Sequence, residues 1–409
     1  MDDLAVIKIV EGGIGLVHPD QTCDFYNSMH SYLSKAGVTG AKIDVIQALE
    51  YVGEEYGGRV ELERAYYKGL TESMIRNFNG NGVISSMQQC NDFFFLGTEQ
   101  VSMGRVGDDF WFQDPNGDPM GVYWLQGVHM IHCSYNSLWM GQMIRPDWDM
   151  FQSDHVCAKF HAGSRAICGG PVYLSDGLGG HNFDLIKKLV FPDGTIPRWI
   201  VFKNPLFDGK SVLKIWNFNK FGGVLGVFNC QGAGWDPKAR RIKGFPDCYK
   251  PISGTFHVKD IEWDQNEEAA AMGKASEYAV YLNQTEQLLT MNPSSKAMEI
   301  TLEPLSFEII NFMPVRTLRC GARFSPIGLT NMFNNGGTIV DCEEGGDGCS
   351  VRMKVKGEGR LLVYSDCKPR SSHVNGVDVG FEWLEQKKIM LKVSWMEGSS
   401  GVTDVVLAY

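Results

Sequence analysis

The sequence predicts an α/β region followed by an all-β region built from antiparallel sheets. In the first half, short apolar stretches alternate with helix-like stretches, which favours parallel βα units over a sandwich. After about Gly209 the stretches become short alternating runs separated by Gly, Asp and Asn, as in antiparallel sheets packed face to face. The length of 409 residues, with 44% hydrophobic positions, leaves room for about two or three globular domains. We therefore predict one region over residues 1–208 and a second over 209–409.

The strand-like stretches of the first half are short, apolar and bounded by Gly or Asp. They are Val38–Asp44, Gly82–Gln89, Val101–Val106 and Pro171–Ser175. The helix-like stretches are Asp20–Lys35, Val60–Asn77, Val122–Gly141, His155–Ile167 and Asn182–Val190. This order favours a (β/α) barrel, with an open sheet as the alternative. A closed eight-stranded barrel takes about 250 residues, more than this region offers, and an incomplete barrel would expose two strand edges.

The second half contains runs of the length and alternation expected for strands. They are Leu213–Phe218, Gly222–Cys230, Tyr278–Leu282, Leu305–Phe312, Ser350–Gly357, Gly359–Ser365 and Lys388–Trp395. No repeat of fixed period connects them. An antiparallel β-sandwich is therefore expected over residues 209–409.

The charge and hydropathy patterns argue against two classes of partner. Lys and Arg number 38 against 48 Asp and Glu, which gives a net charge of −10. Nucleic-acid binding needs clustered basic residues, and the sequence has no such cluster. No apolar run approaches the roughly 18–20 residues of a membrane span. We therefore expect neither a nucleic-acid partner nor a membrane partner.

The N-terminus and the cysteines predict a cytoplasmic protein. Asp2 and Asp3 stand where a signal peptide carries basic residues. The cysteines number 11 and are scattered, and no Cys-x-x-Cys pair indicates a zinc ribbon or a redox site. Since no phosphate-binding loop or dinucleotide motif occurs either, no cofactor is expected.

A lysine and an aspartate end the first predicted strand. In Gly40–Val45, Lys42 and Asp44 are two positions apart, so both side chains project from the same face of the strand. In a barrel these side chains would reach the carboxyl-terminal mouth, where active sites lie. A neighbouring ammonium group favours the ionised carboxylate that a nucleophile requires.

Further acids follow later strands. Asp108 and Asp109 come after Val101–Val106, and Asp147 and Asp149 flank Trp148. Acids at several strand ends, interleaved with aromatic rings, suit sugar chemistry, in which one carboxylate attacks the anomeric carbon and another acid protonates the leaving oxygen. The alternative is that each acid is a solvated loop residue or a helix cap.

Two histidines offer a weaker alternative. His129 and His132 share one face of a predicted helix and could both bind a metal ion. That helix is otherwise apolar and aromatic, and no third ligand lies nearby in the sequence. A core role is therefore favoured for both, and no metal is expected.

Several segments of the sequence resemble one protein family. They are Gly40–Val45, Ser86–Phe95, Arg105–Pro119, Pro146–His155, Gly169–Asp176 and Leu213–Trp235. These segments resemble the plant raffinose-family galactosyltransferases. Those enzymes belong with the alkaline α-galactosidases in a glycoside hydrolase family of retaining enzymes. The resemblance covers nearly the whole chain. Two later segments, Cys248–Gln265 and Ser325–Asp341, resemble the stachyose-forming branch of the family more than the raffinose-forming branch.

The resemblance also implies where the chain lies in the family fold. The family has an N-terminal β domain, a (β/α)₈ barrel and a C-terminal β domain. The chain is expected to begin inside the barrel, so that the first half holds barrel strands 4–8, ending near Asp44, Gln89, Asp108, Asp147 and Ser175. The stretch Thr195–Leu206 is shorter than its family counterpart, which indicates a deletion after the last barrel strand.

By position, the resemblance assigns roles to individual residues. Asp44 matches the nucleophile and Asp109 the acid/base, with Asp108 as its nearest rival. The matched sugar-binding positions are Lys42, Cys90, Asn91, Arg105, Asp108, Asp147, Trp148 and Asp149, with Cys90 and Asn91 on the strand between nucleophile and acid/base. Trp148 and Trp111 are hypothetical walls of the acceptor site.

The resemblance implies a retaining double displacement. Asp44 takes the galactosyl group from galactinol, and raffinose accepts it, giving stachyose. Such enzymes place their two carboxyl groups about 5–5.5 Å apart. The alternatives are sucrose as acceptor, water as acceptor (an α-galactosidase), and an inactive piece of such an enzyme.

Overall fold

The computed structural model describes residues 13, 15–80, 82–87, 91–97, 101–107, 109, 121–196, 202–203, 210–385, 387–396, 398 and 400–409. The chain divides into two compact units. Unit 1 comprises Met1–Asp108 and Asn136–Asp149, and unit 2 comprises Asp109–Tyr135 and Met150–Tyr409. The parallel strands described below belong to unit 1, and the antiparallel sheets belong to unit 2.

Unit 1 is built on a parallel sheet. Its four strands are β1 (Ala41–Ile43), β2 (Val83–Ser85), β3 (Met103–Arg105) and β4 (Arg145–Asp147), which pair in that order. Because all four strands run in the same direction, their carboxyl ends meet at one edge. This is the parallel α/β arrangement that the alternation of strand-like and helix-like stretches predicts.

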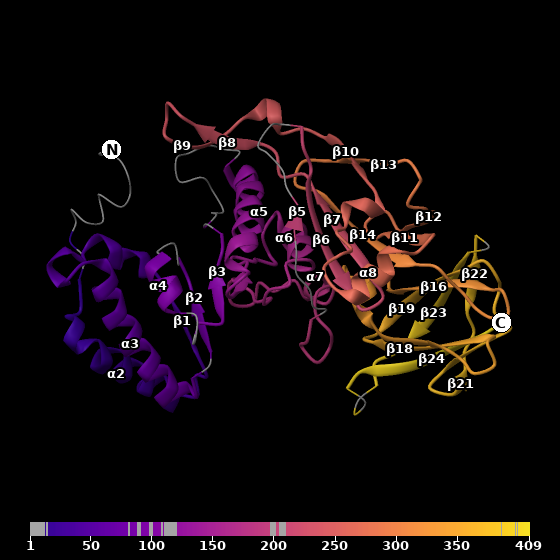
Figure 1. The fold of residues 1–409 in the computed structure, drawn as a ribbon, viewed down its shortest axis with the longest axis horizontal. Coiled ribbons are helices and arrows are strands. Elements are labelled where there is room, and N and C mark those ends of the chain that lie inside the picture. Colours follow the sequence, from indigo (N-terminus) through magenta and orange to yellow (C-terminus); the bar gives the residue numbers. More distant parts are fainter. Residues whose placement is uncertain are drawn as a thin grey trace. The chain divides into compact units, whose positions relative to one another are not determined.

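Two long helices form the core of unit 1 with this sheet. Helices α2 (Thr22–Lys35) and α3 (Arg59–Phe78) lie side by side (Figure 1). Helix α3 is capped by Asn79, whose left-handed φ of 55° stops the helix, and the N–H of Gly80 donates to Met74 O at 3.1 Å. The buried cluster between helices and sheet includes Tyr26, Leu62, Tyr66, Leu70, Met74, Phe78 and Val83.

Two strand predictions in the α/β region were wrong in detail. Strand β2 ends at Ser85, not near Gln89, and Asn91 lies in helix α4 (Asn91–Leu96) instead of on a strand. The stretch Pro171–Ser175 forms no strand, although the N–H of Ser175 donates to Phe151 O at 2.8 Å. Four strands of this region therefore pair in parallel within the described residues.

Three helices precede the antiparallel sheets. Helix α5 (Gly121–Met140) crosses the division between the units, while α6 (Ala158–Arg165) and α7 (Phe183–Ile186) belong to unit 2. Gly127 of α5 lets the helix approach the backbone of Cys230 closely, since an added Cβ would lie 2.3 Å from Cys230 O. Within the described part of the chain, no helix combines the length and the apolar character that a membrane span needs.

The antiparallel half begins with a six-stranded sheet. Its order is β12-β11-β14-β7-β6-β5. The strands are β5 (Phe202–Lys203), β6 (Leu213–Asn219), β7 (Gly222–Phe228), β11 (Tyr278–Leu282), β12 (Gln287–Met291) and β14 (Phe307–Pro314). One face packs against helix α8 (Glu267–Gly273) and the pair β10 (Ile252–Phe256) and β13 (Met298–Leu302). A separate hairpin pairs β8 (Ala233–Asp236) with β9 (Arg241–Gly244).

Two five-stranded sheets complete unit 2 and share one core. The first has the order β15-β16-β19-β23-β22 and the second β17-β18-β24-β20-β21. Their strands are β15 (Arg316–Thr317), β16 (Arg323–Leu329), β17 (Ile339–Glu344), β18 (Ser350–Lys356), β19 (Gly359–Ser365), β20 (Ser371–Val374), β21 (Val377–Asp378), β22 (Glu382–Leu384), β23 (Lys388–Val393) and β24 (Val402–Ala408). Alternate residues of β18 point into this core, which matches the period-2 pattern of its sequence.

Candidate active site

The carboxyl edge of the parallel sheet brings three predicted site residues together. The ammonium of Lys42, on β1, forms an ion pair with the carboxylate of Asp149, which follows β4. The guanidinium of Arg105, the last residue of β3, lies 3.7 Å from the same carboxylate oxygen. The side chain of Asp149 is only 3% exposed, so its charge is held by two cations in a largely dry position.

Backbone hydrogen bonds continue past the strands and order this edge. The N–H of Ser86 donates to Ile43 O at 2.7 Å, and the N–H of Val106 donates to Asp147 O at 3.1 Å. Arg105 also donates from Nε to Gly107 O at 2.8 Å, which fixes the guanidinium beside Asp149. Such a preorganised pair of cations can hold hydroxyl or carboxylate oxygens in fixed directions.

Asp44 follows β1 directly and is exposed. Its Oδ1 accepts a hydrogen bond of 2.9 Å from the N–H of Val45, which has a left-handed φ of 59°. A β-branched residue rarely adopts this conformation, so the turn after Asp44 is strained. The ion pair found for Lys42 joins it to Asp149, across the sheet, and not to its sequence neighbour two positions away.

The other predicted residues at the end of β4 and just after it are buried. Asp147 is 0% exposed, and Trp148 is 1% exposed with its indole N–H donating to Ser137 Oγ at 3.0 Å. The Trp148 ring is therefore buried and offers no open face for stacking on a sugar.

Several predicted residues cannot be placed at this edge. Asp109 is exposed and belongs to unit 2, whereas Asp44 belongs to unit 1. Cys90, Asp108 and Trp111 lie outside the described residues, and of Asn91 only the backbone is described. The stretch Thr195–Leu206 also falls largely outside them. The catalytic assignment of Asp109 therefore stays a prediction.

The two histidines of the weaker alternative occupy a helix in which His129 is 2% exposed. Its Nε2 lies 3.2 Å from the guanidinium of Arg165 and 3.5 Å from Cys133 Sγ. A cation so close would oppose a metal ion, and the described residues contain no group of three or more metal-binding side chains.

Unit 2 holds a further polar group that was not predicted as a site, formed by Asp176, Ser153 and His181. The carboxylate of Asp176 accepts hydrogen bonds from the backbone N–H and the hydroxyl of Ser153, and His181 Nδ1 lies 2.9 Å away. Burial works against ionisation, but these hydrogen bonds hold the pKa of Asp176 below its usual range. The serine donates to the carboxylate and not to the histidine, so the three do not form a nucleophilic triad. The sequence feature that could have pointed to this group is the position of Asp176, directly after the predicted strand Pro171–Ser175.

The sequence of the chain is similar to a family of known proteins. The family described as raffinose synthase or seed imbibition protein Sip1 matches residues 1–393. Stachyose synthase from Pisum sativum is 63% identical over 100% of this chain and 49% of that protein. "Probable galactinol–sucrose galactosyltransferase 4" from Arabidopsis thaliana is 62% identical over 100% of this chain and 48% of that protein. Galactinol–sucrose galactosyltransferase from Pisum sativum is 49% identical over 98% of this chain and 51% of that protein. The chain spans about half the length of the curated relatives it matches.

Proposed function

The chain belongs to the family of raffinose synthase or seed imbibition protein Sip1, and on that premise we propose that it transfers α-galactosyl groups between sugars. The observation that carries the proposal is the arrangement at the carboxyl edge of the parallel sheet. There an exposed carboxylate, Asp44, follows the strand that carries Lys42, and Lys42 pairs with the buried Asp149.

The names of the relatives suggest the sugars. We propose galactinol as donor and raffinose as acceptor, with stachyose as product. Sucrose is the second candidate acceptor, because the relatives at 63% and 62% identity are named for different reactions. No nucleotide sugar is needed if the donor is itself a galactoside, since a covalent intermediate conserves much of the glycosidic bond's free energy.

The proposed first step forms a galactosyl ester. A carboxylate oxygen of Asp44 attacks C1 of the galactosyl group while the bond from C1 to the inositol oxygen breaks. Asp109 donates its proton to that departing oxygen, so inositol leaves as a neutral alcohol. The products of this step are galactosyl-Asp44, free inositol and the Asp109 carboxylate.

The proposed second step reverses the roles. The Asp109 carboxylate takes the proton of an acceptor hydroxyl, and the acceptor oxygen attacks C1 of the galactosyl ester. The ester bond breaks and Asp44 regains its carboxylate, while Asp109 is again protonated. Two displacements at C1 retain the α configuration.

Lys42, Arg105 and Asp149 are proposed to position the galactose. Asp149 can accept hydrogen bonds from sugar hydroxyls, and Lys42 can donate one while it stays paired with Asp149. Because Asp149 is nearly fully buried and Arg105 lies 3.7 Å away, this cluster would hold the ring without moving itself.

The test is incubation of the chain with galactinol and either raffinose or sucrose, followed by chromatography of the sugars. Stachyose or raffinose as product would support a transferase and identify the acceptor. Free galactose alone would support an α-galactosidase instead. If galactinol is unchanged, the chain is an inactive piece of such an enzyme and the proposal is wrong.

Cytoplasmic location stays part of the same proposal. Fractionation of cells that express the chain with a C-terminal tag would test it, and recovery in a membrane or secreted fraction would contradict it.

A further inference from the structure

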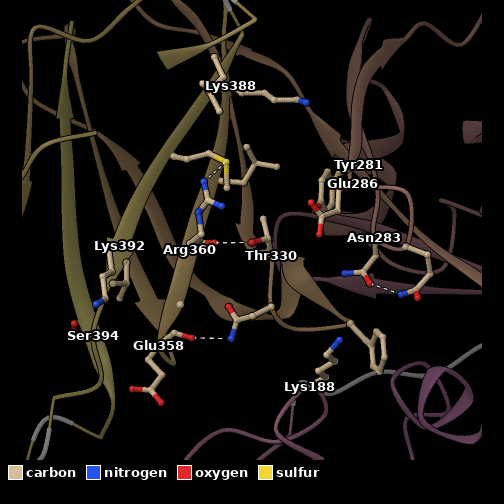
Figure 2. Close-up of a pocket in the computed structure, with 18 of the residues that line it drawn as sticks. Lys188, Tyr281, Asn283, Glu286, Thr330, Glu358, Arg360, Lys388, Lys392 and Ser394 are labelled. Atoms are coloured by element: carbon tan, nitrogen blue, oxygen red, sulfur yellow. Dashed lines mark hydrogen bonds between the residues drawn. The ribbon is translucent and has the colours of Figure 1, made fainter. Parts of the chain in front are cut away.

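Unit 2 contains a pocket of about 970 Å³ whose lining residues all belong to that unit. Its walls come from helix α6, the segment after α7, the β11–β12 turn, the segment after β16 and strands β19 and β23. Figure 2 shows lining residues from several of these segments, among them Lys188, Glu286 and Arg360. Small-molecule sites typically occupy about 300–1,000 Å³, so the pocket could hold a metabolite.

Positive charge dominates the lining. Five cations line the pocket against two carboxylates, in a chain whose net charge is −10. The cations are Lys159, Lys188, Arg360, Lys388 and Lys392, and the carboxylates are Glu286 and Glu358. They come from four separate segments of the fold, so sequence proximity does not explain their clustering. Like charges around one hollow repel each other, and an anion bound between them would relieve that repulsion.

Two of the cations already have partners outside the lining. Arg360 lies 3.1 Å from Glu382, and Lys388 lies 2.7 Å from Glu385. Lys159, Lys188 and Lys392 are exposed, and among the described residues none of them has a carboxylate within ion-pair distance. These three lysines are therefore available to bind an external anion.

The floor of the pocket is rigid. The buried carboxylate of Glu308 accepts hydrogen bonds from the N–H groups of Gln284 and Thr285, at 2.6 and 3.2 Å. Asn283 donates to Met332 O at 2.9 Å, which ties the β11–β12 turn to the segment after β16. This turn carries Glu286 into the lining, so binding would require little ordering of the protein.

The opposite rim is held in the same way. Asn331 donates to Glu358 O at 2.9 Å, and the N–H of Thr330 donates to Arg360 O at 2.9 Å. The ammonium of Lys188 lies 5.5 Å from the ring centroid of Phe333, and the N–H of Phe333 donates to Lys188 O. These contacts fix the position from which Lys188 faces the hollow (Figure 2).

The aromatic lining argues against a neutral sugar as the ligand. Sugar sites usually present an open aromatic face on which a ring can stack. Tyr281 and Phe333, the aromatic residues in the lining, are each only 2% exposed. Charge, and not stacking, is what this pocket offers.

We infer that the pocket binds a small molecule carrying several phosphate groups. A compact polyphosphate presents negative oxygens in several directions, which matches cations placed on separate walls. The inference rests on unit 2 alone and holds whether or not the chain transfers galactose.

The test is isothermal titration calorimetry of the full chain with inositol hexakisphosphate, tripolyphosphate, myo-inositol and raffinose. We expect the two phosphorylated probes to bind with 1:1 stoichiometry, and the two uncharged probes, raffinose and myo-inositol, to show no binding that depends on Lys188 or Lys392. The double variant Lys188→Gln/Lys392→Gln should weaken phosphate-probe binding about tenfold or more, since each tenfold is about 1.4 kcal/mol. Both lysines are exposed, so the variant should keep the melting temperature of the parent chain.

The matched control is Lys274→Gln/Lys368→Gln, which removes the same charge from exposed positions of unit 2 outside the pocket. We expect it to change the affinity less than about twofold, as remote surface charges are screened by salt. The inference is overturned if neither phosphorylated probe binds. Equal weakening by both double variants, or raffinose binding that the Lys188/Lys392 variant abolishes, would overturn it as well.

Discussion

Lys42 and Asp149 form an ion pair across the parallel sheet of unit 1, although 107 residues separate them in the sequence. The pair connects the first strand of the sheet to the segment after the fourth, beside the exposed Asp44. It shows that the carboxyl ends of β1 and β4 cooperate in one charged cluster, with Arg105 of β3 as the third member.

The first prediction concerns the energy of this pair. Asp149→Asn should lower the free energy of unfolding by about 1–3 kcal/mol, because it removes the buried carboxylate that Lys42 and Arg105 share. Lys42→Met should cost less, since the Lys42 side chain is 36% exposed. In urea unfolding of the single and double variants, the two effects should be non-additive by about 0.5 kcal/mol or more. Additive effects would contradict an energetic link between the two residues.

The second prediction concerns the pH dependence of stability. Burial raises the pKa of Glu308, although several hydrogen bonds to its carboxylate oppose the shift. The folded state therefore keeps the proton to higher pH than the unfolded state does. The contribution of Glu308 to stability is fully present below the ordinary glutamate pKa and is lost as pH rises through the folded-state pKa.

Urea unfolding of the parent chain and of Glu308→Gln, repeated from pH 4 upward, should show this. The free energy of the parent minus that of the variant should fall as pH rises, by at most about 1.4 kcal/mol per pH unit. Glu303→Gln, at an exposed position in the same unit, is the matched control. A difference that rises with pH would contradict the raised pKa.

The third prediction concerns the contact between α5 and the backbone after β7. Gly127→Ala would place a Cβ 2.3 Å from Cys230 O and 2.9 Å from Cys230 C. Backbone atoms cannot move aside as a flexible side chain can, so we expect a loss of about 1–3 kcal/mol. This loss should appear although alanine favours a helix interior by about 1 kcal/mol over glycine.

Gly177→Ala is the control, because an added Cβ there meets no atom within 4 Å. Thermal melts should leave this variant close to the parent, while Gly127→Ala melts several degrees lower. Equal melting temperatures for both variants would show that α5 does not pack against Cys230 as described.

Many helices and strands could be predicted from the sequence, because the spacing of apolar residues that indicates them involves only residues close together in the chain. The helix-like stretches Asp20–Lys35 and Val60–Asn77 correspond to α2 and α3 within one or two residues, and Tyr278–Leu282 matches β11. The strand prediction failed where a strand can form only if a second strand, from elsewhere in the chain, lies beside it to accept and donate hydrogen bonds. Pro171–Ser175 is as strand-like in composition as Val101–Val106, yet only the latter contains a paired strand. A ladder requires a neighbour that the local sequence does not specify.

In the candidate site, too, some features could be predicted from neighbouring residues, whereas others depend on residues far apart in the sequence. The two-residue spacing of Lys42 and Asp44 indicated that both would lie at the end of β1, and they do. The pairing of Lys42 with Asp149 depends on the order of strands in the sheet, which no local pattern contains. The hydrogen bond from the buried Trp148 to Ser137 likewise joins the end of β4 to helix α5, a contact that no local pattern contains.

The fourth prediction concerns Asp44 itself. Asp44→Asn keeps an oxygen that can accept the hydrogen bond from the N–H of Val45, and the position is exposed. The free energy of unfolding should therefore change by less than about 0.5 kcal/mol. Galactosyl transfer should nevertheless fall by about a thousandfold or more, since an amide cannot replace a carboxylate nucleophile. Asp24→Asn, at an exposed position of the same unit, should leave both quantities unchanged.

The most direct measurement is to quench a reaction of the chain with galactinol in acid and to locate the bound galactose by peptide mass spectrometry. We predict one galactosyl group on the peptide that contains Asp44, and none in the Asp44→Asn variant. Transfer that continues in the Asp44→Asn variant, or a galactosyl ester on a different residue, would contradict Asp44 as the nucleophile.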